Sequence, residues 1–529
     1  MSAYTGTGQL LRLAWRRDRL LIPVTVATLT ALSVGSAQAT MALYPTDQAA
    51  VEGLGGILSN PAVSAMYGPV VVNRGGLSVF KTVMLGAVFL GILTHALVRR
   101  HTRVEEEEGR FELIGAGVVG RRAPLTAAVV LALLTSIVTA ALSVAGLAAL
   151  GLAPAGSVAF GVTWLIAGVV MTGVAALAAQ LTTSARAASG LGLGTLGAIF
   201  LVRAVGDTQA NAGVLSWISP LGWVGQVRPY GANRLWVLAL ALALLAGCLG
   251  VAFALLQRRD LGSGLLPARP GRATAAASLR SPLALAWRVD RATILGWSVT
   301  YAVLAVVVGN LVKSIADMAD QPQVAEMLRK LGGTAGLLTD IYFATELRFC
   351  AAGGAAAGIV LAVRLATEER VGRTEPLLAA AVSRPRLYVA RLLLALALPT
   401  LLMTVVGLVA GLVAAAADVA GPSPLELTLA AWATLPAVWL LIGVGFAAYG
   451  LGQRWTAPVG WAALTVALVL GEFGPLLELP GWLVGLSPLD HLSQLPGGSF
   501  AAGPAIAMTV LAAVLAAGGA AAFRSRDIG

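Results

Sequence analysis

The sequence predicts an all-α integral membrane protein of about twelve transmembrane helices, arranged as two parallel six-helix repeats. Three observations predict this fold: an excess of apolar over charged residues, long apolar runs, and motifs that occur twice in the same order. Hydrophobic residues make up 58% of the 529 residues and charged residues only 12%, whereas soluble domains average about 45–50% and about 25%. Polar surface could not cover such an excess in water, which excludes a large soluble catalytic domain.

Twelve apolar runs are long enough to cross a bilayer, since a helical span needs about 20 apolar residues. In the first half we expect helices at Leu20–Leu43, Leu77–Val98, Leu125–Leu152, Ser157–Leu181, Ala187–Val205 and Leu235–Leu256. In the second half we expect them at Ala292–Leu311, Phe349–Ala366, Tyr388–Ala415, Leu425–Leu451, Pro458–Phe473 and Ala501–Phe523. Six spans per half is an even number, so both halves begin on the same side of the membrane.

The distribution of Lys and Arg predicts that both termini are cytoplasmic. With the N-terminus inside, 27 of the 36 basic residues fall in inner segments and nine in outer ones. Cytoplasmic loops of membrane proteins carry such an excess of basic residues. The net charge of +11 therefore reflects topology. We expect a multi-pass protein of the plasma membrane that binds no nucleic acid.

Several motifs recur in the same order. Leu-Ala-Trp-Arg-x-Asp-Arg begins at Leu13 and, 272 residues later, at Leu285. Pro-x-Val-x-x-Met begins at Pro61 and Pro322, and Ser-Pro-Leu begins at residues 219 and 487. This order predicts two parallel repeats, related by an axis along the membrane normal. We expect a first half at residues 1–257, a cytoplasmic linker rich in Arg, Pro, Gly and Ala at 258–282, and a second half at 283–529.

An acidic element, Glu-Glu-x-x-Gly-Arg-x-Glu, lies between the second and third expected spans of each half. Its residues are Glu105, Glu106, Gly109, Arg110 and Glu112 in the first copy and Glu368, Glu369, Gly372, Arg373 and Glu375 in the second. In a helix, Glu106 would pair with Arg110, and Glu369 with Arg373, at i,i+4. The glycine, unfavourable inside a helix, indicates a bend or a close approach by another backbone. A solvated loop is one interpretation, but the repeated spacing favours an element that docks a two-fold partner.

A basic segment that contains a tryptophan precedes the first span of each half. We call the two copies the Trp-Arg segments; they contain Trp15, Arg16, Asp18 and Arg19, and Trp287, Arg288, Asp290 and Arg291. Their composition predicts short amphipathic helices at the membrane surface, and a simple interfacial anchor is the alternative. No His or Cys has a partner at metal-ligand spacing, so we expect no metal site.

The chain lacks the motif with which a transporter could hydrolyse ATP itself. A P-loop requires Gly-x-x-x-x-Gly-Lys followed by Ser or Thr, and none of the three lysines, Lys81, Lys313 and Lys330, follows a glycine. Ion coupling usually places carboxylates near the membrane midplane, whereas Asp and Glu here lie in loops or at span ends. We therefore expect a transport subunit that is not itself an enzyme, with ATPases on separate chains. An ion-coupled secondary transporter and a non-transporting scaffold or sensor accessory are the alternatives.

These features together resemble the ABC-2-type permease superfamily: six spans per half, a Trp-Arg segment, an acidic element between spans two and three, and a Ser-Pro-Leu motif before span six. Over its whole length the chain is similar to the fused, double-length permeases of actinobacterial multidrug and polyketide-antibiotic ABC exporters, including mycobacterial ones. The resemblance implies a type V exporter fold in a bacterial inner membrane and outward movement of an amphiphilic drug-like or lipid-like molecule.

The resemblance also implies roles for residues. The Trp-Arg segments would be elbow helices, and the acidic elements would be coupling helices in grooves of two P-loop ATPase subunits. Those subunits would bind ATP and magnesium, while this chain would hold no cofactor. Side chains expected to line a central substrate cavity are Phe80, Met84, Phe89, Phe200 and Phe349. The two acidic elements differ, because Glu107, Glu108 and Phe111 correspond to Arg370, Val371 and Thr374, which puts equal coupling in doubt.

Overall fold

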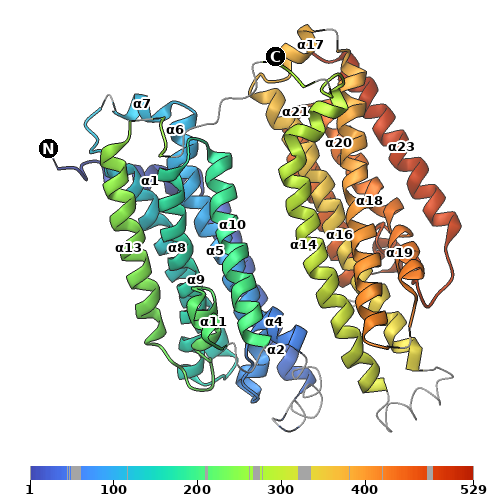
Figure 1. Ribbon diagram of the computed structural model, residues 1–529, viewed down its shortest axis with the longest axis horizontal. Coiled ribbons are helices and arrows are strands. Elements are labelled where there is room, and N and C mark those ends of the chain that lie inside the picture. The colour runs from blue at the N-terminus through green and yellow to red at the C-terminus, as the bar shows by residue number, and fades with distance from the viewer. Residues whose placement is uncertain are drawn as a thin grey trace. The chain divides into compact units, whose positions relative to one another are not determined.

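The computed structural model describes residues 2–44, 46, 48, 61–115, 117–208, 213–260, 262–265, 274–276, 278–319, 335–380, 382–419, 421–473 and 480–527. Within these ranges the chain forms helices and loops but no strand, which confirms the predicted all-α fold class. The chain divides into two compact units, Met1–Gly271 and Arg272–Gly529, both visible in Figure 1. This division falls within residues 258–282, where we expected the linker.

Unit 1 is a bundle whose long helices run side by side (Figure 1). Its helices are α1 (Thr7–Arg17), α2 (Leu21–Leu43), α4 (Pro61–Tyr67), α5 (Arg74–Arg99), the π-helical turn η1 (Arg100–Val104), α6 (Glu105–Glu107), α7 (Arg110–Gly115), α8 (Ala123–Ala149), α9 (Pro154–Leu181), α10 (Ala185–Thr208), α11 (Gly213–Ile218), α12 (Gly222–Gln226) and α13 (Val237–Arg258). Helices α5, η1 and α6 form one continuous helical stretch, and the acidic element begins in its last part, α6.

Unit 2 is a second helical bundle. Its helices are α14 (Pro282–Ala319), α16 (Ala335–Arg370), α17 (Glu375–Ala379), α18 (Arg384–Ala416), α19 (Pro424–Trp432), α20 (Leu435–Leu451), α21 (Gln453–Leu468), the π-helical turn η2 (Val469–Phe473), α22 (Gly481–Val484) and α23 (Ala502–Ser525). Here the acidic element begins at the end of α16.

Eleven helices within the described residues are long and apolar enough to cross a membrane, and each corresponds to one of the twelve expected spans. The remaining expected span, Pro458–Phe473, is formed by α21, which has 16 residues, and by η2, which adds five. The apolar runs of the sequence therefore identify the long helices of both units.

The two Trp-Arg segments fold differently. In unit 1 the segment ends α1, a separate helix of 11 residues. In unit 2 it belongs to α14, which continues unbroken for 38 residues, so the prediction of a separate short helix is wrong there. Pro23 explains the difference, because proline lacks the N–H that a continuous helix would need, and α14 contains no proline after Pro282.

A glycine sets the distance between α5 and α9 in unit 1. A Cβ at Gly86 would lie 2.0 Å from Cζ2 of Trp164, so a larger residue would displace the indole. Trp164 is fully buried, and its Nε1–H donates to the Thr82 carbonyl oxygen over 3.1 Å. The helix that carries the first acidic element is thus fixed to its neighbour.

The repeated Ser-Pro-Leu motif makes the same contact in both units. Ser219 Oγ donates to the carbonyl oxygen of Ile199 in α10 over 2.5 Å, and Ser487 Oγ donates to that of Ala467 in α21 over 2.7 Å. Each motif therefore ties the segment before the sixth span to the fifth span of its own unit.

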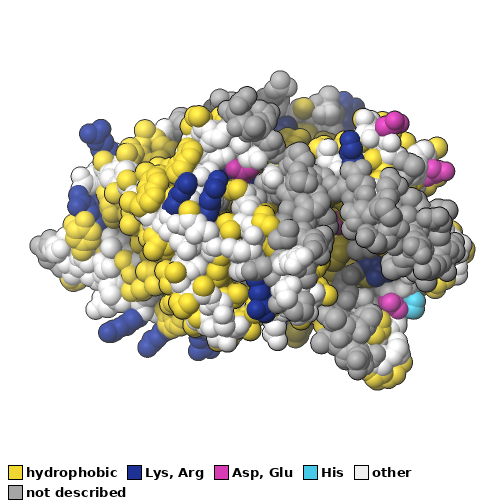
Figure 2. Space-filling model, turned by 90° about the horizontal axis from the view of Figure 1, so that it is seen from below, with side chains coloured by type: hydrophobic (Ala, Val, Ile, Leu, Met, Phe, Trp, Pro, Cys, Tyr) yellow, Lys and Arg dark blue, Asp and Glu magenta, His cyan; other side chains and the backbone are white. Residues whose placement is uncertain are grey.

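A buried arginine holds the short helix α4 against α10. Arg203 is fully buried, forms an ion pair with Asp207 over 3.0 Å, and donates to the carbonyl oxygen of Ala65 in α4. In unit 1, α4 and α11 lie at the end opposite α6 and α7 (Figure 1). Seen from that end, the left part of Figure 2 shows yellow hydrophobic side chains between scattered dark-blue Lys and Arg side chains. Exposed apolar surface of this kind is typical of a protein in contact with lipid.

Candidate functional site

The acidic elements bend at their glycines. Gly109 has a φ of 71° and Gly372 a φ of 72°, values in the left-handed region that glycine adopts without a steric penalty. A Cβ at Gly109 would meet nothing within 4 Å. The bend that we expected at this glycine is therefore confirmed, and the close approach of another backbone is not.

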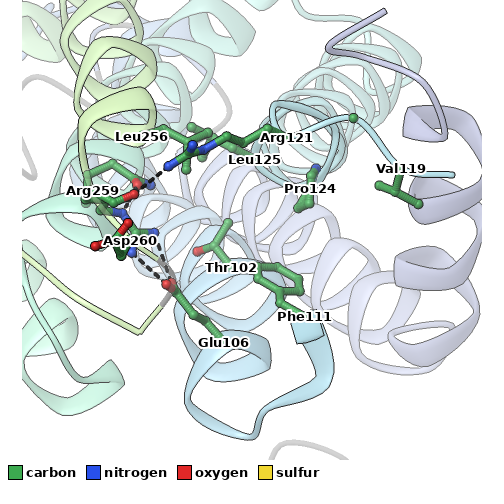
Figure 3. Close-up of a pocket in the computed structure, with 12 residues that line it drawn as sticks. Thr102, Glu106, Phe111, Val119, Arg121, Pro124, Leu125, Leu256, Arg259 and Asp260 are labelled. Carbon is green, nitrogen blue, oxygen red and sulfur yellow. Dashed lines mark hydrogen bonds and ion pairs between the residues drawn. The ribbon is translucent and has the colours of Figure 1, made fainter. Parts of the chain in front are cut away.

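In unit 1, the second glutamate of the element lies inside a buried network of cations. Glu106 accepts hydrogen bonds from Arg103 Nη1 at 2.7 Å, from Arg259 Nη1 at 2.6 Å and from the Gly262 backbone N–H at 2.7 Å. Arg259 also donates to Gln180 in α9 over 2.8 Å. Figure 3 shows Glu106 and Arg259 facing each other. The end of α5 is thus joined to the residues that follow the sixth span of the same unit.

In unit 2, the equivalent glutamate also pairs with an arginine that follows the sixth span, whereas its other partner is a tyrosine. Glu369 accepts from Tyr449 Oη over 2.5 Å and from Arg526 Nη2 over 2.7 Å. The Arg526 guanidinium also lies 5.2 Å from the ring centroids of Tyr449 and Phe523. Arg526 directly follows α23, the last helix of this unit. Both acidic elements are therefore held by an arginine that follows the sixth span, and we call these two ion pairs the latches.

The latch arginines belong to a further repeat, which was not among the motifs that we identified in the sequence. Arg259-Asp260-x-Gly262 recurs 267 residues later as Arg526-Asp527-x-Gly529. The motif is short and lies at the ends of the two halves, beside the linker in one case. The sequence signal for it is the Arg-Asp-x-Gly pattern itself, which follows the last apolar run of each half.

The predicted i,i+4 pairs are wrong. Arg110 pairs with Glu105 at 3.1 Å and with Glu108 at 2.7 Å rather than with Glu106. Glu369 pairs with Arg526, and Arg373 is exposed. The turn at each glycine ends the helix, so the glutamate and the following arginine do not lie on one helical face.

The remaining charged residues of the elements divide into buried and exposed groups. Glu105 is buried and pairs with Arg17 of α1, while Glu368 pairs with Arg391 of α18. Exposed charged side chains are Glu107, Glu108, Arg110, Glu112, Arg370, Arg373 and Glu375. This second group is accessible to a partner protein.

The Trp-Arg segments each expose a tryptophan and bury an aspartate. Trp15 and Trp287 are about half exposed, and all four arginines of the motif, Arg16, Arg19, Arg288 and Arg291, are exposed. Asp18 contacts Arg100 at 3.0 Å and His101 at 2.5 Å. Asp290 contacts Arg364 at 2.9 Å and Arg391 at 2.8 Å. The aspartates thus anchor the segments to neighbouring helices.

The five side chains expected in a substrate cavity occupy different environments. Phe80 packs against Tyr67, with ring centroids 5.4 Å apart, and Met84 is buried in the core of unit 1. Phe89 and Phe349 are 49% and 51% exposed on the long helices α5 and α16. Phe200 is half-buried, and the Arg203 guanidinium lies 4.6 Å from the centroid of its ring. The cavity role of all five stays a prediction.

A pocket of about 380 Å³ lies beside the first latch. Its lining residues, labelled in Figure 3, include the apolar side chains of Phe111, Pro124 and Leu125 and the charged side chains of Glu106 and Arg259. Arg121 crosses the pocket edge and donates to the Arg259 carbonyl oxygen. The surface around the acidic element of unit 1 is therefore recessed rather than flat.

Comparisons with known proteins identify the family of this chain. Residues 279–524 match the family described as "Multidrug efflux system permease Rv1217c, C-terminal domain". The chain is also 40% identical over 532 residues to the multidrug efflux system permease protein Rv1217c of Mycobacterium tuberculosis, an alignment that covers 100% of this chain and 96% of the relative. With that identity over its full length, the chain belongs to the actinobacterial ABC-2-type permease family that includes this mycobacterial multidrug efflux permease.

Proposed function

We propose that this chain is the transmembrane subunit of an ATP-driven ABC exporter that moves amphiphilic drug-like or lipid-like molecules out of a bacterial cell. The observation that carries the proposal is the duplicated acidic element, which each unit presents at the end of a long apolar helix. The name of the mycobacterial relative, a multidrug efflux system permease, supports drug-like cargo. ATP and Mg²⁺ would bind to separate ATPase chains.

Two ATPase chains would dock on the exposed parts of the acidic elements. In unit 1 these parts include Glu108, Arg110 and Glu112, and in unit 2 they include Arg373 and Glu375. Exposed charges at an interface guide encounter and fix orientation more than they add affinity. The recess beside Glu106 would receive an apolar side chain of the partner, because Phe111, Pro124 and Leu125 are among the residues that line it.

The latches would transmit motion of the docked ATPases to the sixth spans. Each acidic element continues the second span of its unit directly, and Glu106 and Glu369 join it to Arg259 and Arg526. A displacement of the element would therefore pull on two spans of the unit at once. The exposed Phe89 and Phe349 on the second spans would contact the cargo during that motion, since aromatic side chains offer large apolar contact area.

The stoichiometry of the complex tests this function. We expect the purified permease alone to hydrolyse no ATP and, after co-expression with its cognate ATPase, to form a complex of one permease with two ATPase chains. The reason is that this chain has no P-loop lysine but has two acidic elements. Native mass spectrometry measures the ratio. A stable complex with a single ATPase, or ATP hydrolysis by the permease alone, would contradict the proposal.

Chemical labelling in intact cells tests the orientation. In a chain without Cys248 and Cys350, we expect Val214→Cys to react with a membrane-impermeant maleimide and Thr274→Cys to react only after lysis. The Lys and Arg distribution predicts this result, and residues 214 and 274 are both exposed. Reaction of Thr274→Cys in intact cells would show that the orientation is reversed.

A further inference from the structure

A groove of about 780 Å³ opens in unit 2 between the Trp-Arg segment of α14 and helix α18. One side carries Trp287, Arg288 and Arg291, and the other side carries Leu393 and Ala397. Leu393 is about half exposed, so the groove presents an apolar wall next to two guanidinium groups. This combination has no role in the coupling described above.

The groove is positively charged, and its charged groups are free to bind a ligand. Both arginines are exposed, and none of the described residues that line the groove is a carboxylate. Asp290 lies between them in sequence but is buried, where it contacts Arg364 and Arg391. Within the described part of the chain neither Arg288 nor Arg291 forms an ion pair. The groove therefore has two cationic groups that can bind an anion.

The order of groups along the groove matches an amphiphile that lies in a bilayer. Tryptophan and arginine prefer the membrane–water boundary, while the neighbouring residues of α18 belong to an apolar span of 33 residues. Basic pockets between transmembrane helices on the cytoplasmic side bind anionic lipid headgroups. We propose that this groove binds one anionic phospholipid, whose phosphate contacts Arg288 and Arg291 and whose acyl chain packs along Leu393 and Ala397.

The other half of the chain provides a matched comparison. Arg16 and Arg19 occupy the same motif positions in unit 1 and are also exposed. The pocket beside α1, however, measures about 30 Å³ and contains Arg17, whose charge is neutralised by Glu105. Replacing Arg16 and Arg19 removes as much positive charge as replacing Arg288 and Arg291, but it leaves the groove of unit 2 unchanged.

Lipid retention measured by native mass spectrometry tests the proposal. The full-length permease is extracted from vesicles of phosphatidylcholine and phosphatidylglycerol in equal parts. We expect one phosphatidylglycerol to be retained preferentially, and Arg288→Gln with Arg291→Gln to weaken this retention about thirty-fold, as two interfacial arginines predict. The pair Arg16→Gln and Arg19→Gln should retain the lipid as the unaltered chain does.

Two further arms distinguish a bound lipid from a free anion held by the arginines alone. Ala397→Trp, which fills the apolar wall and leaves both arginines in place, should also reduce retention of phosphatidylglycerol. Inorganic phosphate in excess should not displace the bound lipid. Equal retention of the two lipids, equal losses in the two arginine pairs, or displacement by phosphate would each overturn the proposal. Ala397→Trp keeps the test decisive if the double arginine variant does not fold.

Discussion

Glu106→Ala is expected to lower the free energy of unfolding of unit 1 by about 3–5 kcal/mol, the cost of removing one partner from a buried ion pair. The side chain of Glu106 is 3% exposed, that of Arg103 1% and that of Arg259 8%. Without the carboxylate, both guanidinium groups stay buried beside each other with no negative charge. Thermal unfolding of the purified permease, followed by tryptophan fluorescence, measures the change.

Arg110→Ala is the matched control for this effect. Arg110 belongs to the same acidic element, but its side chain is 44% exposed and that of its partner Glu108 is 47% exposed. Its other partner, the buried Glu105, keeps its ion pair with Arg17 when Arg110 is removed. Exposed ion pairs contribute about 0–1 kcal/mol, so the melting temperature should change little. If Glu106→Ala were as mild as Arg110→Ala, the buried network would not stabilise unit 1.

In unit 2, Glu369→Arg combined with Arg526→Glu should recover stability that either single substitution loses.

This burial changes how the docking role has to be tested. From the sequence alone, charge reversal at Glu106 or Glu369 would be expected to disturb a partner contact and leave the fold intact. In the structure both carboxylates are buried in their own units, so a reversal there would damage the permease itself. Glu108, Glu112 and Glu375 are exposed, and substitutions at these positions address the ATPase contact directly.

The long helices were predictable because a single requirement of the bilayer determines them. A run of about 20 apolar residues has to be helical in a bilayer, where all backbone hydrogen bonds must be made within the segment. The glycine bend was predictable for a similarly local reason. By contrast, the expectation of a short separate helix held for α1 but failed for the second Trp-Arg segment. The absence of a proline after Pro282 in α14, where the first half has Pro23, could have indicated this difference.

The partners of the acidic elements were not predictable from local spacing. Glu106 and Arg259 are 153 residues apart, and Glu369 and Arg526 are 157 apart. A helical i,i+4 rule cannot find such pairs, because the chain has to fold into a bundle before they meet. Likewise, the sequence identifies Phe80 as an aromatic residue in a span, but only packing shows that it contacts Tyr67.

A second large effect is expected where α20 and α23 touch. A Cβ at Gly450 would lie 2.1 Å from the carbonyl oxygen and 2.6 Å from the Cα of Gly519. These are backbone atoms, so no side-chain rotation can relieve the overlap, and the two helices would have to separate. Close contacts between small residues hold transmembrane helices together. The separation would also loosen Phe523 from Tyr388 and Tyr449, whose ring centroids lie 6.0 and 5.2 Å away.

We therefore expect Gly450→Ala to lower the free energy of unfolding of unit 2 by about 1–3 kcal/mol, the usual cost of overpacking. Gly518→Ala is the control: it adds the same methyl group one residue from the contact, where a Cβ meets nothing within 4 Å. Because alanine favours a helix by about 1 kcal/mol over glycine, this control should melt at the same or a higher temperature. Arg526 directly follows α23, so Gly450→Ala should also weaken the second latch. With the ATPases bound, the variant should then export less cargo per ATP hydrolysed. Equal melting temperatures for the two variants would show that α20 and α23 do not depend on this contact.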